Sequence, residues 1–325
     1  MNTELKFAHR LSVAPMLDWT ARDFRYLCRL LSRHTMLYTE MVTTGALLHG
    51  DAARFLDHDA AEYPLALQLG GCDPGDLAAC AKLAEDAGYQ EINLNVGCPS
   101  DRVQNGQFGA CLMANPDLVA DGVVAMKAAV NIPVTVKTRL GIDELDSYEF
   151  LHQFVSAIEK AGADALILHA LKAWLSGLSP KQNRDIPPLD YDRVYQIKRD
   201  FPALHVDING GIHSLDEALQ HLHIVDGAMI GRAIYNQPYL LAAADKRIFN
   251  DDRPVASEPD IVGQMLPYIE KRMRQGRPLK SITRHMLGLF QGQPGARRWR
   301  RHLSENAHLP DADINVIRDA LKLIG

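Results

Sequence analysis

Short apolar runs recur along the chain as far as Gly231, and segments with an apolar face at helical spacing separate them. Eight runs predict strands: Ser12–Met16, Leu37–Met41, Leu65–Gly70, Glu91–Gly97, Val134–Thr138, Ala165–Ala170, His205–Gly210 and Asp226–Gly231. Apolar residues at i, i+3 and i+4 predict amphipathic helices over Asp76–Ala87, Pro116–Ala129, Tyr148–Ala161 and Ser214–His221. Ser214 and Glu217 have the spacing of a capping box.

This alternation of strands and helices predicts the fold class. Eight strands, each followed by a helix or a connecting segment, are typical of the closed (β/α)8 or TIM barrel, which needs ~250 residues. A doubly wound open sheet is the alternative, but no GxGxxG sequence follows the first strand. We therefore predict an α/β protein built on a TIM barrel.

The C-terminal part of the chain has a different pattern. Strand-like runs stop, Asp251–Pro254 has the composition of a linker, and Ile261–Ile324 predicts helices that break near Gly276, residues 292–295 and Pro310. We expect a barrel domain in residues 1–245 and a helical domain in residues 246–325.

Composition bounds the class of protein. The 325 residues are 47% hydrophobic and 23% charged, which is ordinary for a globular protein with a full core. No apolar run reaches the ~20 residues of a membrane span, and Met1–Arg10 lacks the apolar stretch of a signal peptide. The five cysteines have no metal-type spacing, which favours reduced thiols and predicts no metal site. We expect a cytoplasmic protein with no obligate protein partner.

Charge is divided unevenly along the chain. The net charge is −5, yet Lys246–Arg301 contains 13 Lys and Arg against 5 Asp and Glu. Such asymmetry indicates either a polyanionic partner or a solvated helix face, and charge alone does not separate the two.

Polar residues follow the ends of six predicted strands, and in a barrel these ends open onto one rim. They are Gln68, Asn95, Cys98, Lys137, Arg139, His169, Asn209, Gly210, Gly211, Gly231 and Arg232. The glycines after the last two strands occupy the place where barrels commonly bind phosphate, and Arg232 adds a cation. Pro15 and Met16, after the first strand, fit either a flat apolar wall for a ring system or ordinary core.

Cys98 is the most reactive residue type on this rim, in the turn Gly97–Pro99 directly after a strand. The thiol can be a nucleophile, which needs an adjacent base, or a proton donor in its neutral form, or inert. These residues alone leave the three roles open. The other cysteines, Cys28, Cys72, Cys80 and Cys111, are expected to be small buried apolar residues.

Taken together, these motifs resemble those of the flavin-dependent tRNA-dihydrouridine synthases, and more narrowly their A-type subfamily. The resemblance covers nearly the whole chain. Its segments are SVAPMLDWT (12–20), YTEMVT (38–43), LQLGG (67–71), NLNVGCPS (93–100), VKTR (136–139), KAWLSGLSP (172–180), ITRHMLGLF (282–290) and GARRWRR (295–301). The last two segments point to the A-type.

The resemblance implies a mechanism and a set of ligands. FMN would lie over the barrel mouth with NADPH as electron donor, hydride would pass from the reduced flavin to uracil C6, and Cys98 would protonate C5. The substrate would be uridines 20 and 20a of the tRNA D-loop, extruded from the folded tRNA to reach the flavin.

The same resemblance implies residue roles. Flavin-lining residues would be Pro15, Met16 and Leu17, with Gln68, Lys137 and His169 on the ring and ribityl side. Phosphate would be held by Asn209, Gly210, Gly211, Gly231 and Arg232. Contacts to tRNA would come from Asn95, Arg139, Lys181, Arg184, Arg297 and Arg300.

One position departs from the family pattern. The family has His-Ala-Arg after the sixth strand, whereas this chain has His169-Ala170-Leu171. We expect the missing guanidinium to leave FMN binding intact and to affect substrate grip or turnover, with either compensation by Arg139 or Lys172 or a weakened variant as the outcome. Leu171→Arg is expected to turn over faster.

Three other functions fit parts of the pattern. A dihydroorotate-dehydrogenase-like FMN barrel would reduce or oxidise a free pyrimidine and would not need the basic tail. A tRNA-binding protein with weakened or lost catalysis is consistent with Leu171. A barrel aldolase would use Lys137 as a Schiff base, but nothing in the sequence desolvates that lysine.

Overall fold

The computed structural model describes residues 1, 3–100, 106–179 and 181–324. Its centre is a barrel of parallel strands in the order β1-β8-β7-β6-β5-β4-β3-β2. The strands are β1 (Leu11–Val13), β2 (Leu37–Thr43), β3 (Leu65–Gly70), β4 (Glu91–Val96), β5 (Val134–Arg139), β6 (Ala165–His169), β7 (His205–Asn209) and β8 (Gly227–Ile230). A parallel bridge between Ser12 and Met36 joins β1 to the start of β2 and completes the ring. The predicted TIM barrel is confirmed.

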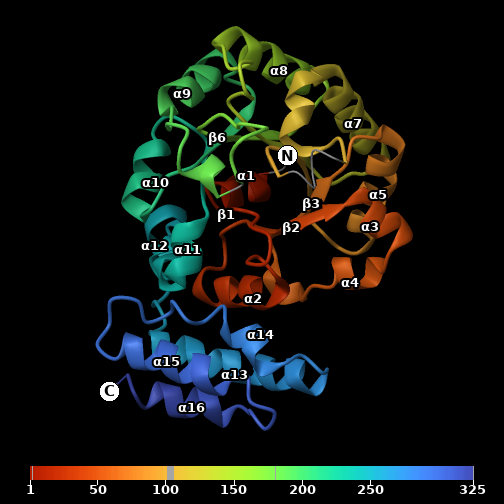
Figure 1. Ribbon diagram of the computed structural model, residues 1–325. Helices are drawn as coiled ribbons and strands as arrows, with labels where there is room; N and C mark the ends of the chain where they lie inside the picture. The colour runs from red at the N-terminus through yellow and green to blue at the C-terminus, as the bar shows by residue number, and fades with distance from the viewer. Residues whose placement is uncertain (2, 101–105, 180, 325) are drawn as a thin grey trace.

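Helices surround the barrel on its outside (Figure 1). They are α2 (Arg22–Leu31), α3 (Thr44–His49), α4 (Ala52–Leu56), α5 (Pro74–Asp86), α7 (Pro116–Ala129), α8 (Tyr148–Lys160), α9 (Tyr191–Asp200), α10 (Leu215–His221), α11 (Arg232–Asn236) and α12 (Ala244–Phe249). Short 3-10 helices lie at Ala60–Glu62, Gly109–Ala114, Gln182–Arg184 and Pro238–Ala243. A further helix, α1 (Thr3–His9), closes the end of the barrel where the strands begin, with Leu5 and Ala8 in the interior cluster.

The two faces of the strands have opposite character, and β4 shows this most clearly. Ile92, Leu94 and Val96 face the helices and belong to the main apolar core. The alternate residues Glu91, Asn93 and Asn95 face the barrel interior, since successive side chains on a strand point to opposite faces. The outward face therefore drives folding, while the inward face is free to carry polar chemistry.

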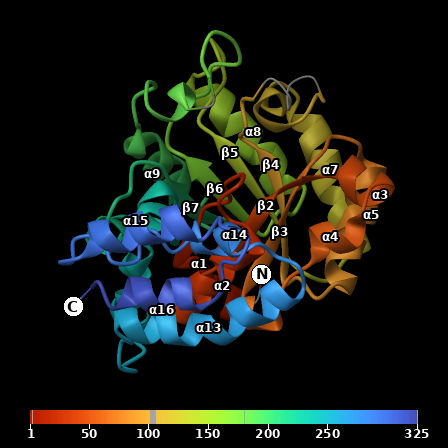
Figure 2. The same cartoon turned by 60° about the horizontal axis from the view of Figure 1, so that its bottom comes forward.

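The C-terminal helices α13 (Glu258–Arg274), α14 (Leu279–Thr283), α15 (Ala296–Asn306) and α16 (Asn315–Leu321) pack beside the barrel next to α2 (Figures 1 and 2). The rings of Tyr26 and Tyr268 stack at 3.9 Å between α2 and α13. Within this helical part Trp299 is fully buried, and its Nε1 donates to the carbonyl of Met286 at 3.0 Å. A C-terminal helical domain is thus confirmed.

Three local predictions are wrong. The first strand is Leu11–Val13 rather than Ser12–Met16, because Pro15 has no N–H and the Met16 amide donates to Thr20 Oγ1. At α10 the Ser214 hydroxyl accepts from the Glu217 amide, but the Glu217 carboxylate accepts from the amide of His213, so the capping box is half formed.

The third wrong prediction concerns two of the cysteines. Cys28 and Cys80 are buried as expected. The thiols of Cys72 and Cys111 are only half-buried, because both lie in loop or 3-10 segments at the mouth end of the strands.

Within the described part of the chain, no helix combines the length and apolarity needed to cross a membrane.

Candidate functional site

The strand ends predicted to form a site do converge at the mouth of the barrel. Lys137 Nζ, from the end of β5, donates to Asn209 Oδ1 at 3.0 Å across the barrel. Asn209 in turn donates from Nδ2 to the carbonyl of Met229 in β8 at 2.8 Å. The side chains of β5, β7 and β8 are thereby fixed relative to one another at the mouth.

The mouth holds a cluster of cationic groups. Burial, and then the neighbouring Arg139 charge, lower the pKa of Lys137 to about 7. Burial also lowers the pKa of His169 well below its ordinary value, with Arg139 and Lys137 adding to the effect. Among the described residues, no carboxylate forms an ion pair with the cations Lys137 and Arg139 or with His169, whose lowered pKa makes it a neutral imidazole at pH 7. The mouth is therefore suited to an anionic ligand that would supply the missing negative charge.

Cys98 lies on a turn whose backbone amides are hydrogen-bonded to the side chain of Asn95. Asn95 Oδ1 accepts hydrogen bonds from the amides of Gly97 and Cys98, both at 3.0 Å. The thiol is half-buried, and its Sγ lies 3.5 Å from Ser100 Oγ. Arg139 Nε donates to the carbonyl of Gly97, the residue before Cys98, at 2.8 Å, so the thiol lies on a turn bonded to the cationic cluster.

Arg139 joins three loops of the mouth. Its Nε donates to the carbonyl of Gly97 at 2.8 Å, and its Nη1 donates to the carbonyls of Lys172 and Asn183. Only 4% of the residue is exposed. The geometry gives Arg139 a loop-joining function, and a contact with tRNA through its remaining Nη2 stays a prediction.

Glycines form the predicted phosphate side. Gly210 and Gly211 have φ of 111° and 67°, which favour glycine. A Cβ at Gly210 would lie 2.7 Å from the His169 ring, and one at Gly211 would lie 2.4 Å from Leu189. Side chains are thus excluded at both positions, where Gly210 is buried and Gly211 is half-buried.

Arg232, on the same side, is exposed and pairs with Asp185 at 2.6 Å. A bound phosphate would compete with this carboxylate. Across the mouth, a Cβ at Gly231 would lie 3.5 Å from the sulfur of Met16, so Met16 packs against the phosphate side. Leu17 is 70% exposed and Pro15 is half-buried, which leaves an apolar edge beside the mouth.

A cleft of about 450 Å³ lies between the mouth and the helical domain. Leu17, Glu40 and Met41 line its barrel side, and Arg272, Arg277 and Arg284 line the other. Burial raises the pKa of Glu40, whose carboxylate accepts from the amide of Asp18.

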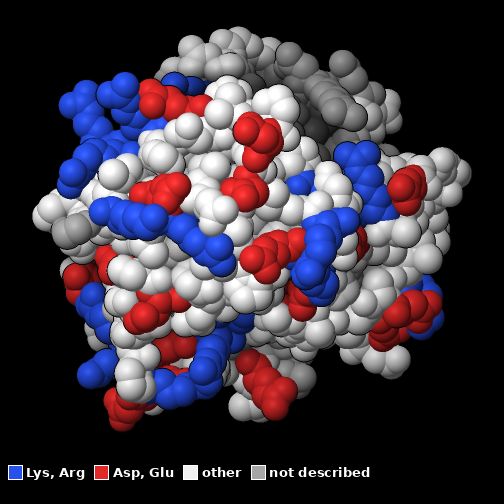
Figure 3. All heavy atoms as spheres, turned by 90° about the horizontal axis from the view of Figure 1, so that it is seen from below, with Lys and Arg blue, Asp and Glu red and all other residues white. Residues whose placement is uncertain are grey.

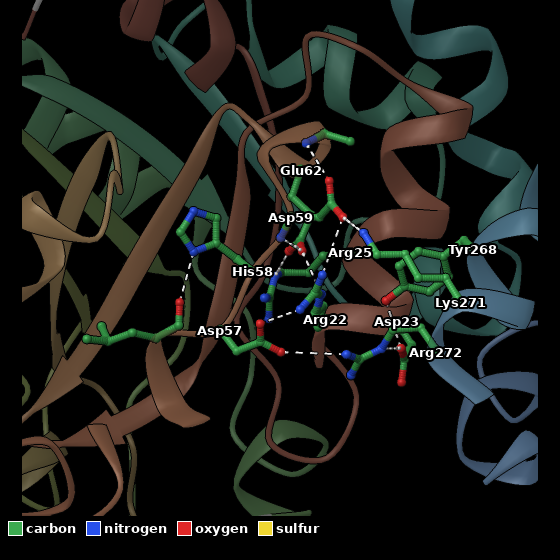
Figure 4. A network of polar contacts seen from close by, with 12 residues as sticks. Arg22, Asp23, Arg25, Asp57, His58, Asp59, Glu62, Tyr268, Lys271 and Arg272 are labelled. Carbon is green, nitrogen blue, oxygen red and sulfur yellow. Dashed lines mark hydrogen bonds and ion pairs between the residues drawn. The ribbon is translucent and has the colours of Figure 1, made fainter. Parts of the chain in front are cut away.

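The network of Figure 4 contributes several residues to the lining of this cleft, among them Asp23, Arg25 and Arg272. Asp23, in α2, is 1% exposed and accepts from Tyr268 Oη at 2.8 Å, Arg277 Nε at 3.1 Å and Arg272 Nε at 3.3 Å. Arg25 Nε donates to Glu62 at 2.6 Å, and both side chains are buried. Lys137 and Arg139 at the mouth form no ion pair with a carboxylate of the described residues, whereas these arginines all have carboxylate partners.

Arginines also gather on α15. Arg297, Arg298, Arg300 and Arg301 line a hollow of about 660 Å³ together with Ser304. Figure 3, which looks at the helical side of the molecule, shows basic side chains grouped at one edge of this face and mixed with acidic ones elsewhere. Of the predicted tRNA residues, Arg297 and Arg300 lie here and not at the mouth. Lys181 and Arg184 are exposed on the loop after β6.

Five residues of the barrel interior were missed from the sequence: His9, Glu91, Asn93, Thr135 and Asp207. All are less than 1% exposed. The available signal was the polar residue at every second position of β4 and β7, which an apolar-interior barrel would not have.

Leu171 is 1% exposed, on the loop after β6. Its carbonyl accepts from the amide of Leu140, which ties this loop to the end of β5.

A barrel that concentrates unpaired cations where its strands end has the architecture of a TIM-barrel enzyme, because such enzymes carry out their chemistry at this face. We assign the chain to this class.

Comparison with known proteins specifies the family. A family model described as dihydrouridine synthase (Dus) matches residues 12–324, and the chain belongs to this family. It is 62% identical over 316 residues to a protein of Vibrio cholerae named tRNA-dihydrouridine(20/20a) synthase, with 97% of this chain and 96% of the relative covered. A protein of Escherichia coli K12 with the same name is 62% identical over 323 residues, covering 99% and 93%.

Among solved structures, a complex of 2-naphthoyl-CoA reductase with 2-naphthoyl-CoA is similar, with a TM-score of 0.57 and 10% identity. The match covers 73% of this chain and 50% of that one, and it shows the fold alone.

Proposed function

We propose that this protein reduces the C5–C6 double bond of uridines 20 and 20a in tRNA to dihydrouridine. The names of relatives 62% identical over nearly the whole chain support this substrate. The observation that carries the chemistry is the Cys98 turn beside a cationic cluster without a carboxylate partner.

The cofactor we propose is FMN, with NADPH as electron donor. The mouth supports it, because Lys137 and Arg139 are cations that pair with no carboxylate among the described residues, and because Gly210 and Gly211 present backbone without a side chain. The neutral His169 ring would add a hydrogen bond. Gln68 and Asn209 would complete the polar side, Gly231 and Arg232 the phosphate side, and Pro15, Met16 and Leu17 the apolar edge. When bound and reduced, the flavin supplies hydride to uracil C6.

Cys98 would deliver the proton to C5. A neutral thiol is competent for this transfer, and the thiolate it leaves behind would be stabilised by the nearby charges of Lys137, Arg139 and Arg184. Lys137 and His169 can also donate hydrogen bonds toward charge that develops on carbonyl oxygens during reduction.

We propose that residues 246–325 bind tRNA and residues 1–245 carry out the reaction. The arginines of α15 support this division, since they concentrate positive charge without reading bases. Arg297 and Arg300 would contact tRNA phosphates, while Asn95, Arg139, Lys181 and Arg184 would contact the extruded nucleotide or its neighbours. A tRNA substrate makes the cytoplasm the expected compartment.

The test is mass-spectrometric mapping of dihydrouridine in unmodified tRNA incubated with the protein, FMN and NADPH. Cys98→Ala is expected to lower the rate at uridines 20 and 20a by about 100-fold or more, the usual contribution of a positioned acid. Cys72→Ala and Cys111→Ala remove half-buried thiols outside this turn and should keep the parental rate. Full activity in Cys98→Ala would exclude the thiol as the acid. Reduction of free uridine monophosphate at the same rate would exclude tRNA as the required substrate.

A second candidate is a tRNA-binding protein of weak catalytic power, favoured by the apolar Leu171 in the site loop. A cofactor-loaded protein that binds tRNA but forms no dihydrouridine would support it.

A further inference from the structure

A chain of hydrogen bonds crosses the barrel interior from the Cys98 turn to the opposite end. Asn95 Nδ2 donates to Gln68 Oε1 at 2.9 Å, and Gln68 Nε2 donates to Asn93 Oδ1 at 2.8 Å. Asn93 Nδ2 then donates to Thr135 Oγ1 at 2.8 Å, and Thr135 Oγ1 donates to Glu91 Oε1 at 2.6 Å. Every donor in this chain points away from the mouth and toward Glu91.

Glu91 ends the chain because it is surrounded by donors. Tyr38 Oη donates to its Oε1 at 3.0 Å, and His9 Nε2 lies 2.6 Å from its Oε2. His9 Nδ1 lies 2.6 Å from Asp207 Oδ2, so the imidazole bridges two carboxylates. Burial alone would lower the pKa of His9, but the charges of Glu91 and Asp207 raise it well above its ordinary value.

We propose that Glu91 and Thr135 are positioning residues for the Cys98 turn, acting through the fixed direction of this hydrogen-bond chain. Glu91 Oε1 accepts from both Tyr38 Oη and Thr135 Oγ1, so the single hydroxyl hydrogen of Thr135 points to Glu91. Toward Asn93 the hydroxyl can then only accept, which fixes the orientation of the Asn93 amide.

The same constraint passes along the chain to the mouth. Asn93 presents its oxygen to Gln68, Gln68 presents its oxygen to Asn95, and Asn95 must therefore present Oδ1 to the turn. That oxygen accepts from the amides of Gly97 and Cys98. If the direction were reversed, the Asn95 NH₂ group would face two N–H donors and the turn would lose both bonds.

Substitution of Thr135 tests the proposal in the full chain with its cofactor. Thr135→Val removes the hydroxyl and keeps the side-chain shape, so the direction of the amides above it is no longer specified. We expect amide hydrogen exchange in a peptide containing residues 97 and 98 to accelerate at least about 5-fold, since these amides lose a fixed acceptor. Thr135→Ser, which keeps a hydroxyl, should restore slow exchange.

The control is Ser12→Ala, since the Ser12 hydroxyl is buried in the same barrel and forms no hydrogen bond within the described residues. It should leave exchange at 97 and 98 unchanged. If Thr135→Val does not fold, Thr135→Cys, with a weaker donor, takes its place. Unchanged exchange at 97 and 98, or equal acceleration in peptides from β6 and β7, would overturn the proposal.

A rate measurement connects the turn to catalysis, and this part rests on the proposed function. Thr135→Val is expected to lower kcat for tRNA reduction about 10-fold while KM for tRNA stays unchanged. If the parent protein reduces no tRNA, the proposed function fails, whereas the exchange result still decides whether the chain positions the turn.

Discussion

The barrel mouth and the junction between barrel and helical domain both gather basic side chains, but the buried cations of the junction have carboxylate partners, whereas Lys137 and Arg139 of the mouth have none among the described residues. At the junction, Arg272 and Arg277 share Asp23, and Arg25 pairs with Glu62. At the mouth, the Lys137 ammonium is bonded only to the amide oxygen of Asn209 among the described residues. Cations that have their counter-charges stabilise an interface, whereas cations that lack them are available for a ligand. The comparison therefore predicts that Lys137 contacts a ligand and that Arg272 and Arg277 are structural.

The largest expected effect comes from breaking the junction at Asp23. Asp23→Asn would leave two guanidinium groups and a tyrosine hydroxyl without their shared anion. We expect a loss of about 3 kcal/mol in the free energy of unfolding, at the low end for a buried pair because Arg277 is 40% exposed. Urea unfolding of the full chain measures it.

Asp57→Asn is the matched control for Asp23→Asn. Asp57 also pairs with Arg272 and with Arg22, but its side chain is 45% exposed. An exposed pair contributes ~1 kcal/mol or less. If Asp23→Asn and Asp57→Asn lower the free energy of unfolding equally, burial of the carboxylate does not determine how much it stabilises the junction.

At the mouth we expect a substitution to increase stability. Lys137→Met should raise the free energy of unfolding of the cofactor-free protein. Because the folded-state pKa of Lys137 is about 7, below the ordinary value of 10.5, its charge costs stability in the folded state. The cost is complete at and below pH 7 and disappears as the pH rises toward 10.5. After allowance for solvent screening we expect a gain of roughly 2 kcal/mol at pH 7, measured by thermal unfolding between pH 7 and 9.5.

Lys127→Met provides the comparison for Lys137→Met, since Lys127 pairs with Asp164 at 2.8 Å. It should bring no gain. In the FMN-bound protein the same substitution should be unfavourable, because Lys137→Met is expected to weaken flavin binding. A destabilised cofactor-free Lys137→Met protein would mean that this cation has a counter-charge after all.

The sequence predicts a region of the structure well where the residues that drive folding form a regular pattern. The barrel was predictable because outward-facing residues such as Leu94 and Val136 form apolar runs that recur at regular intervals. The mouth residues were predictable as a set, because every parallel strand ends at the same rim.

Hydrogen bonds and ion pairs between residues far apart in the sequence could not be predicted in the same way. Asp23 lies in the first turn of α2, where an acidic residue is ordinary, and its partners come about 245 to 254 positions later. Arg139 was predicted as a tRNA contact, yet its loop-joining bonds depend on where three loops meet. His9 was missed because α1 is only 7 residues long and has no extended apolar periodicity.

The smallest expected effect comes from Leu171→Arg, which adds one more cation to the mouth. Leu171→Arg would restore the family pattern beside Arg139, which has no carboxylate partner among the described residues, and Lys172, which pairs with Asp146. In the cofactor-free protein the added charge should lower the unfolding temperature by a few degrees, corresponding to about 1 kcal/mol. Saturating FMN should reverse the order, because an anionic ligand stabilises the state that binds it more tightly. With tRNA as substrate, kcat/KM should rise several-fold. Leu171→Met, of similar length and without charge, should reproduce neither change, and equal kcat/KM for Leu171→Arg and its parent would contradict a functional role for the guanidinium.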